Sequence, residues 1–178
     1  MKQTLRTASV LLSAALLALV IMGLFVKEVS YTATARVKSP VAESWVTFID
    51  IDRQNLWQRN LENVEALHGQ PMSLGASFRL EFTDGSARLE TVTSVIPLQE
   101  YHADIETSTY SGYRSVTFET LGEGSRIQQT IVMRGSSFIN RALLPVIRPL
   151  MQRDEMAALD NLADLIEASP SVNIQEFE

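Results

Sequence analysis

The sequence predicts an α+β fold with seven antiparallel strands and one long C-terminal helix. Three observations support this prediction. Segments that alternate apolar and polar residues, many of them β-branched, fill the middle of the chain. Short turn-forming sequences separate these segments, and short connections favour antiparallel pairing. Apolar residues then recur at helical spacing over 139–168.

Length and composition indicate one folded domain with appendages. The chain has 178 residues, of which 46% are hydrophobic and 20% are charged. The absence of cysteine excludes disulfides and thiolate chemistry, and with only His68 and His102 as imidazoles no metal site is expected. From Glu28 onward there are 12 basic and 21 acidic side chains, so nucleic acid is not an expected partner.

Residues 1–27 are predicted to be a transmembrane signal anchor. Thr7–Val26 has 20 residues without a charge, and as a helix it would be about 30 Å long, the hydrocarbon thickness of a bilayer. Lys2 and Arg6 precede it, so the domain is expected on the non-cytoplasmic side, periplasmic or extracellular. A cleaved signal peptide is the alternative, although the apolar run is long and no small-x-small site directly follows it.

The first part of the domain is predicted to be a strand followed by two short helices. Val29–Val37 alternates apolar with polar residues and is rich in β-branched side chains. Ser39 offers an N-cap, with proline after it, for a helix that ends near Ile49. Asp52 offers a cap for a second short helix through Trp57.

The rest of the domain is predicted to contain six strands and the long helix. The strands are expected at 64–67, 77–83, 87–96, 101–109, 113–121 and 125–134. Pro145 and Pro149 are expected to kink the helix 139–168, or to delay its regular part until about Leu150. Residues 169–178 are predicted to be a flexible acidic tail.

Three stretches, together with the order of the elements, carry a family resemblance. They are Ser39–Asp50 followed by Trp57, Leu74–Leu80, and Gly124–Arg126. Over residues 28–168 the chain resembles the START-like superfamily, also called the polyketide cyclase and dehydrase, SRPBCC or Bet v 1-like group. The resemblance implies a helix-grip fold, in which a seven-stranded antiparallel sheet wraps around the terminal helix and leaves a cavity for lipids, sterols, polyketides or other apolar molecules.

Candidate ligand-binding residues follow from this expected cavity. Phe78, Leu80 and Phe82 alternate with polar residues, so they face inward, where they either line a pocket or fill a core. Periodicity does not settle which face of 87–96 points inward. The full candidate set is Trp57, Phe78, Leu80, Phe82, Tyr101, Gln129, Met133, Ile147 and Met151.

Other polar groups have simpler interpretations. His102, Asp104 and Glu106 share one face of a strand, and we interpret this face as solvated because the opposite row is apolar. Asp50 and Asp52 are interpreted as helix ends rather than metal ligands. No phosphate loop and no Ser-His-Asp set appears. We therefore predict no catalytic, cofactor-binding or metal-binding residue.

The predicted function is that of a membrane-anchored protein that binds a hydrophobic small molecule or lipid between sheet and C-terminal helix. The alternatives are a cyclase-like or dehydrase-like enzyme acting on an apolar substrate, and an envelope interaction module without a ligand. A cavity lined by Phe, Leu and Met favours the binding protein. A buried, partnered carboxylate or histidine at the cavity favours the enzyme, and a filled core favours the interaction module.

Overall fold

The computed structural model describes the backbone of residues 2–169 and the side chains of residues 11, 13, 14 and 17–169. All seven predicted strands form, and the last helix is a single long element. The elements in chain order are α1 (Lys2–Phe25), β1 (Val29–Val37), α2 (Val41–Ile49), η1 (Ile51–Arg53), α3 (Gln54–Trp57), β2 (Leu61–His68), β3 (Ser77–Phe82), β4 (Ala87–Ile96), β5 (Glu100–Thr107), β6 (Tyr110–Leu121), β7 (Gly124–Gly135) and α4 (Phe138–Ala168).

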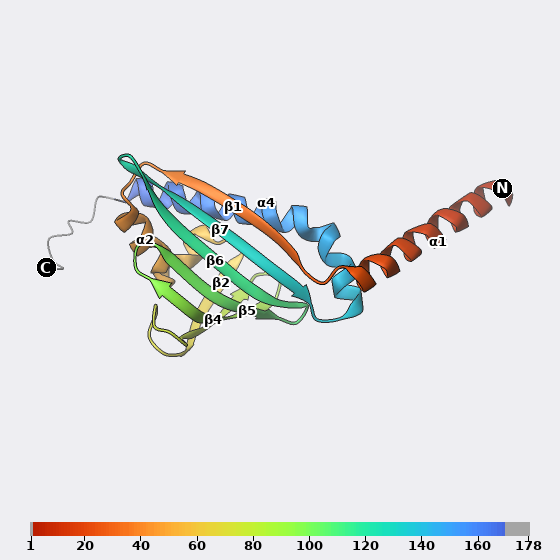
Figure 1. The fold of residues 1–178 in the computed structure, drawn as a ribbon, viewed down its shortest axis with the longest axis horizontal. Helices are drawn as coiled ribbons and strands as arrows, with labels where there is room; N and C mark the ends of the chain where they lie inside the picture. The colour runs from red at the N-terminus through yellow and green to blue at the C-terminus, as the bar shows by residue number, and fades with distance from the viewer. Residues whose placement is uncertain (1, 170–178) are drawn as a thin grey trace, which may run out of the picture.

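The seven strands form one antiparallel sheet in the order β1-β7-β6-β5-β4-β3-β2. The first and last strands of the chain therefore pair at one edge, and every other pairing joins neighbours in sequence. The sheet curves around α4, which runs along its inner face (Figure 1). This arrangement confirms the sheet and the helix that the sequence predicts.

Alternating burial shows which face of each strand points toward α4. In β1, Val29, Tyr31 and every second residue after them are buried, and the residues between them are exposed, as predicted. In β4, Glu90 and Val92 are buried. The inner face of β4 is therefore the even-numbered one over this stretch, which settles the point that periodicity left open.

The predicted caps of the two short helices are wrong in detail. Pro40, not Ser39, is the N-cap residue of α2, and it makes no side-chain cap hydrogen bond. Asp50, not Asp52, caps the next turn, because its carboxylate accepts a 3.2 Å hydrogen bond from the backbone N–H of Asp52. A short acidic side chain readily bonds the backbone two residues ahead, and Asp50 lies where the chain is still extended.

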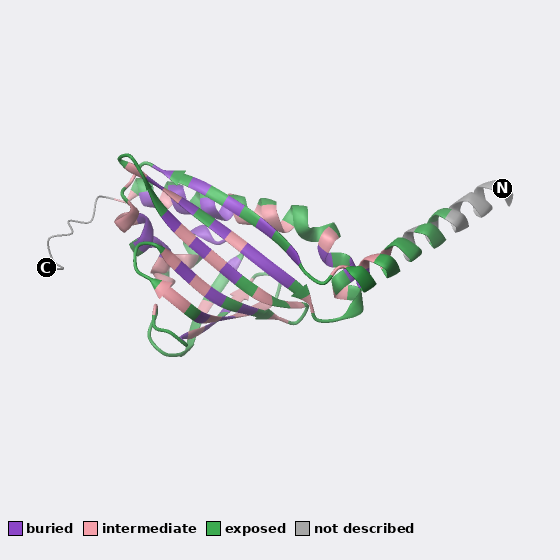
Figure 2. Cartoon of the chain, in the orientation of Figure 1, coloured by how far each residue is buried: buried purple, intermediate pink, exposed green. Residues whose placement is uncertain are grey.

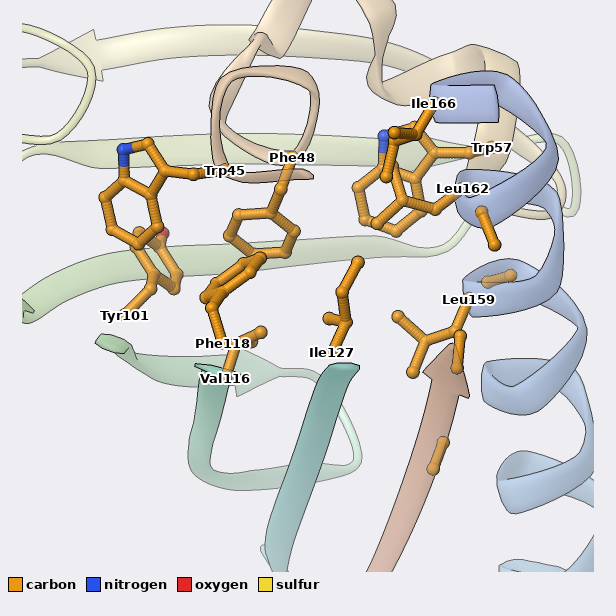
Figure 3. Packing of buried hydrophobic residues seen from close by; sticks show 14 of the residues in the cluster. Trp45, Phe48, Trp57, Tyr101, Val116, Phe118, Ile127, Leu159, Leu162 and Ile166 are labelled. Atoms are coloured by element: carbon orange, nitrogen blue, oxygen red, sulfur yellow. The ribbon is translucent and has the colours of Figure 1, made fainter. Parts of the chain in front are cut away.

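An aromatic and aliphatic core fills the space between α2, α3, the sheet and the C-terminal part of α4. The Phe48 ring lies 5.9 Å from that of Trp57 and 5.3 Å from that of Phe118, centroid to centroid. On α4, Leu159 and Leu162 are fully buried against them. Figure 3 shows these side chains converging from the two short helices, the sheet and α4. This end of the interface between sheet and helix is therefore closed.

Helix α4 is continuous but changes direction in its first third (Figure 1). Pro145 and Pro149 lie inside it, where each removes a backbone donor and crowds the preceding turn. The prolines therefore bend the helix without delaying its start, which Ser137 caps by accepting a hydrogen bond from the Asn140 N–H. The helix ends at Ala168, and the predicted tail lies outside the described residues from position 170 onward.

Helix α1 leaves the domain beside the start of α4 (Figure 1). A side-chain carbon added at Gly23 would lie 2.9 Å from the backbone carbonyl oxygen of Phe138, which cannot rotate away, so the close approach of the two helices requires glycine. Within the part of the chain that the structure describes, no helix combines the length and the apolar character needed to cross a membrane. The anchor of residues 1–27 stays a prediction.

Candidate functional site

A cavity of about 360 Å³ separates the sheet from the middle of α4. Its lining comes from the start of β1, the α3–β2 connection, the β3–β4 and β5–β6 turns and the middle of α4. Its size is within the range of small-molecule sites, about 300–1,000 Å³. The lining residues used below are Tyr31, Gln58, Arg59, Phe82, Asp84, Arg88, Thr107, Tyr110, Met151, Asp154, Glu155 and Ala158.

Two arginines and a glutamate form a buried ionic cluster behind the cavity wall. Arg114 donates to both carboxylate oxygens of Glu90, at 2.9 and 3.1 Å, and Arg88 donates to one of them at 2.7 Å. The Arg114 and Glu90 side chains are almost completely buried. Such a cluster stands in the interior only because each charge has a partner within hydrogen-bond distance.

Hydrogen bonds extend this cluster across the interior to α4. The other terminal nitrogen of Arg114 donates to Gln129 at 3.3 Å, and the Gln129 amide donates to the carboxylate of Glu155 on α4. Arg88 also donates to Gln58 at 3.1 Å. Two arginines and two carboxylates are thus connected through amides, and their formal charges balance.

The charges of the cluster set its protonation states. Burial alone would raise the pKa of the Glu90 carboxyl, but Arg114 and Arg88 outweigh it and hold that pKa below its ordinary value. Burial, and then the negative charge of Glu155, raise the pKa of Tyr31 well above its ordinary value. Burial likewise raises the pKa of Tyr110. Near neutral pH the cavity therefore offers two neutral hydroxyls, and the Glu90 carboxylate behind its wall is ionised and paired with both arginines.

Glu155 differs from the other carboxylates of the cavity. Asp154 is paired with Arg59 at 2.9 Å, and Asp84 accepts the backbone N–H of Ser86. Among the described residues, Glu155 has the Gln129 amide as its hydrogen-bond partner and no salt bridge. The Glu155 carboxylate therefore faces an amide rather than a cation, and its remaining lone pairs can accept hydrogen bonds from a ligand.

The predicted ligand-binding residues fall into three groups. Phe82 and Met151 line the 360 Å³ cavity. Phe78, Leu80 and Tyr101 line a second cavity of about 20 Å³, which has room for about one water molecule. The remaining four lie elsewhere: Trp57 and Met133 are fully buried in the core, Gln129 bridges Arg114 and Glu155, and Ile147 is exposed on α4.

Sequence reasoning missed the polar residues that distinguish this cavity. Tyr31, Arg88, Glu90, Tyr110 and Glu155 were not among the candidates. Part of the signal was present, because Glu90 is in phase with Val92 on β4, as Arg114 is in phase with Val116 and Phe118 on β6. A charged residue in phase with buried apolar neighbours predicts a buried ion pair when a second strand offers the opposite charge.

The outer face of the sheet is solvated, as predicted for His102, Asp104 and Glu106. Asp104 and Glu106 are exposed, and His102 lies 3.2 Å from the carboxylate of Glu100. A shallow groove on this face includes both acidic residues and Arg134. Over the residues searched, no group of three or more histidine, aspartate or glutamate side chains is placed to hold a metal ion.

Comparisons with known proteins support the fold. No family model matches the chain, and no curated protein matches its sequence. Among solved structures, Ara h 8.0201 superposes with a TM-score of 0.67 at 10% identity, over 80% of this chain and 99% of that one. TTHA0849 from Thermus thermophilus gives a TM-score of 0.68 at 17% identity, over 80% of this chain and 100% of that one. The chain therefore has a Bet v 1-like helix-grip fold, as the family resemblance implied.

Proposed function

We propose that the protein binds an amphipathic small molecule or lipid in the cavity between the sheet and α4. The observation that carries this proposal is a 360 Å³ cavity whose wall joins apolar side chains to a charge-balanced polar cluster. Phe82, Met151 and Ala158 offer apolar contact, while Tyr31 and Tyr110 offer hydroxyls. A filled core, the condition for an interaction module without a ligand, occupies the other end of the interface, whereas at this end a smaller buried cluster around Leu144 lies beside the open cavity.

The charge balance favours a neutral head group on the ligand. Arg88 and Arg114 are already paired with Glu90, and Arg59 is paired with Asp154, so an anionic head group would find no free cation among the described residues of the cavity. A hydroxyl, carbonyl or amide can instead accept from the tyrosines or donate to Glu155 without adding charge. A pure hydrocarbon would leave these polar groups unpaired once it displaced water. An apolar body with a neutral polar end is the best match.

We also propose that α1 anchors the domain in a membrane, with the domain on the non-cytoplasmic side. The uncharged run Thr7–Val26 and the cationic residues before it support this orientation. A reporter fused after Glu178 tests it, because a reporter active only outside the cytoplasm is expected. A reporter active inside the cytoplasm would contradict the orientation.

The ligand proposal is tested by native mass spectrometry of the full-length protein, followed by extraction of the molecules that copurify. Decanol, decanoic acid and decane then serve as matched probes in competition with an environment-sensitive apolar dye. We expect decanol to compete best, because it combines an apolar chain with a neutral head group. If the dye does not bind and no apolar molecule copurifies, the proposal is wrong.

A matched pair of variants places the ligand in this cavity. Met151→Trp adds bulk to the cavity wall, whereas Met156→Trp makes the same change five positions later on the same helix, where Met156 is 45% exposed. We expect Met151→Trp to weaken decanol binding at least tenfold and Met156→Trp to leave it unchanged, an effect of about 1.4 kcal/mol or more. Equal effects of both changes would exclude this site.

An enzyme is the second candidate, and Glu155 is the observation that favours it. It is a carboxylate at the cavity without an arginine partner among the described contacts, close to the neutral Tyr31 that its charge influences. Such a group can act as a general base toward an apolar substrate. Mass spectra of the molecules bound to wild type and to Glu155→Gln decide between the two functions. A binding protein holds the same molecule in both, whereas an enzyme accumulates unconverted substrate in the variant.

A further inference from the structure

We propose that the first half of α4, residues 138–150, lies on the surface of an anionic phospholipid bilayer and brings the mouth of the cavity to it. This inference rests on the proposed membrane anchor and adds a second, peripheral contact with the same bilayer. Its basis is a row of exposed apolar side chains at helical spacing. The row, here called the outer stripe, consists of Ile139 (66% exposed), Leu143 (42%), Val146 (60%) and Leu150 (55%).

The outer stripe runs along one side of the helix. Its members are spaced by four, three and four residues, which places them above one another on an α-helix. Leu144, in contrast, is buried against Tyr31, Ile131 and Met133 on the sheet. The helix therefore satisfies its contact with the sheet without the stripe. Four large apolar side chains in one exposed row are unusual for a surface that only water covers.

The outer stripe is continuous with the apolar surface of α1. The Gly23–Phe138 contact joins the C-terminal end of α1 to the first residue of α4. Leu24 and Phe25 on α1 are strongly exposed as well. Figure 2 shows exposed residues along α1 and through the first turns of α4. If α1 spans the bilayer, the stripe starts at the level where α1 leaves it.

The charges around this junction suit anionic head groups. The segments 24–28 and 134–150 contain four basic residues, Lys27, Arg134, Arg141 and Arg148, and one acidic residue, Glu28, which pairs with Arg134 at 3.2 Å. The domain as a whole is acidic, and the second half of α4 carries five carboxylates. Basic residues beside an apolar face favour an anionic membrane surface, into which such a helix sinks by about 5–10 Å.

The cavity lies beside this same junction. Val26, at the end of α1, packs on a cluster that Tyr110 and Met151 also contact, and both of these line the cavity. The β5–β6 turn, which also lines the cavity, lies at this end of the sheet, so contact of the outer stripe with the bilayer would bring the cavity close to the lipid head groups. An amphipathic ligand would then pass between bilayer and cavity without crossing bulk water.

Single cysteines test the inference cleanly, because the chain has no cysteine of its own. Val146→Cys reports on the outer stripe, Met156→Cys is the control on the second half of α4, and Leu17→Cys reports on α1. Each full-length variant carries a fluorophore in vesicles of phosphatidylcholine with phosphatidylglycerol. Quenching by nitroxide lipids is compared with quenching by aqueous iodide, after circular dichroism confirms folding.

We expect nitroxide lipids to quench the label at 146 several-fold more than the label at 156, and removal of phosphatidylglycerol to reduce that quenching. Iodide quenching of the 146 label equal to that at 156 would overturn the inference. Protection of the 146 label from both quenchers would also overturn it, since protein, such as a second copy of the chain, would then cover the stripe. A Leu17 label that iodide reaches and lipid does not would refute the anchor separately, whatever the 146 label shows.

Discussion

The two ends of the interface between the sheet and α4 differ in what fills them. At the end near α2 and α3, Phe48, Trp57 and Leu162 pack without leaving space for a small molecule. At the end near α1, Tyr31, Tyr110 and their neighbours surround an open cavity, and the buried ionic cluster lies between this cavity and Phe48. One sheet and one helix thus make both a closed apolar core and a partly polar cavity.

The two ends contribute to the stability of the fold in different ways. The closed end buries apolar area and excludes water, so it supplies much of the stability. The open end holds charges that are tolerated only as a connected set, so each of its residues depends on a specific partner. Substitutions at the two ends should therefore reduce the free energy of unfolding for different reasons. Matched pairs of variants separate those reasons.

The largest expected effect comes from Glu90→Gln. It leaves Arg88 and Arg114 buried without their shared carboxylate, which should reduce the free energy of unfolding by about 3–5 kcal/mol. Glu155→Gln keeps an oxygen that can accept from Gln129 and should lose about 1 kcal/mol. Urea unfolding followed by circular dichroism measures both. Equal losses of unfolding free energy in the two variants would mean that Glu90 is no more important to the ionic cluster than Glu155.

A leucine pair on α4 gives the next effect. Leu162→Ala opens a cavity in the closed end and should reduce the free energy of unfolding by about 2–5 kcal/mol. Leu150→Ala makes the same change on the outer stripe and should alter it by less than about 0.5 kcal/mol. Thermal and urea unfolding in detergent measure the pair. A large loss for Leu150→Ala would show that the stripe is packed against protein.

The pH dependence of stability should show two limbs with separate origins. The pKa of Glu90 is lowered in the fold, so its contribution is present above its ordinary value of 4.5 and lost as pH falls below that value. The pKa values of Tyr31 and Tyr110 are raised, so their contribution is present below the ordinary 10.0 and lost as pH rises above it. Urea midpoints across pH measure both limbs.

Glu90→Gln should flatten the acid limb and leave the alkaline limb in place. Glu119→Gln, which removes the carboxylate of an exposed pair with Arg126, is the control and should leave both limbs unchanged. If stability still falls at low pH to the full extent in Glu90→Gln, the acid limb must come from other carboxylates.

The smallest effect on stability is expected for Tyr31→Phe. Among the described hydrogen bonds the Tyr31 hydroxyl has no protein partner, so the free energy of unfolding should change by less than about 0.5 kcal/mol. The hydroxyl lines the cavity and should contribute about 0.5–1.5 kcal/mol to decanol binding. Dye competition measures the loss. Unchanged affinity for decanol would place the head group elsewhere in the cavity.

Local patterns were sufficient for most of the fold. The alternation in β1 predicted both its bounds and its buried face, and turn residues separated the later strands correctly. β2 begins at Leu61, whereas the predicted strand began at position 64. The prediction started too late because Glu62 and Asn63 interrupt the apolar pattern that marks a strand. The helix α4 was predicted, and a kink at its prolines was one of the two expected outcomes. The helix does bend in its first third, where the prolines lie.

The candidate site was less predictable, because its residues depend on partners that are distant in the sequence. Phe82 and Met151 were found from their apolar character alone. Arg88 and Glu90 are charged residues on a strand, and on β4 alone they are equally compatible with a solvated face. They point inward because β6 places Arg114 against Glu90, and each charge in that interior requires the other.

The sequence by itself determined the strands, the long helix, their order and the apolar N-terminal run, because each depends on a repeat visible within a few residues. The tertiary structure decided which end of the interface is closed and which is open. Burial at each end depends on contacts that several strands and a bent helix make together. A local sequence pattern does not show which of these distant segments will meet.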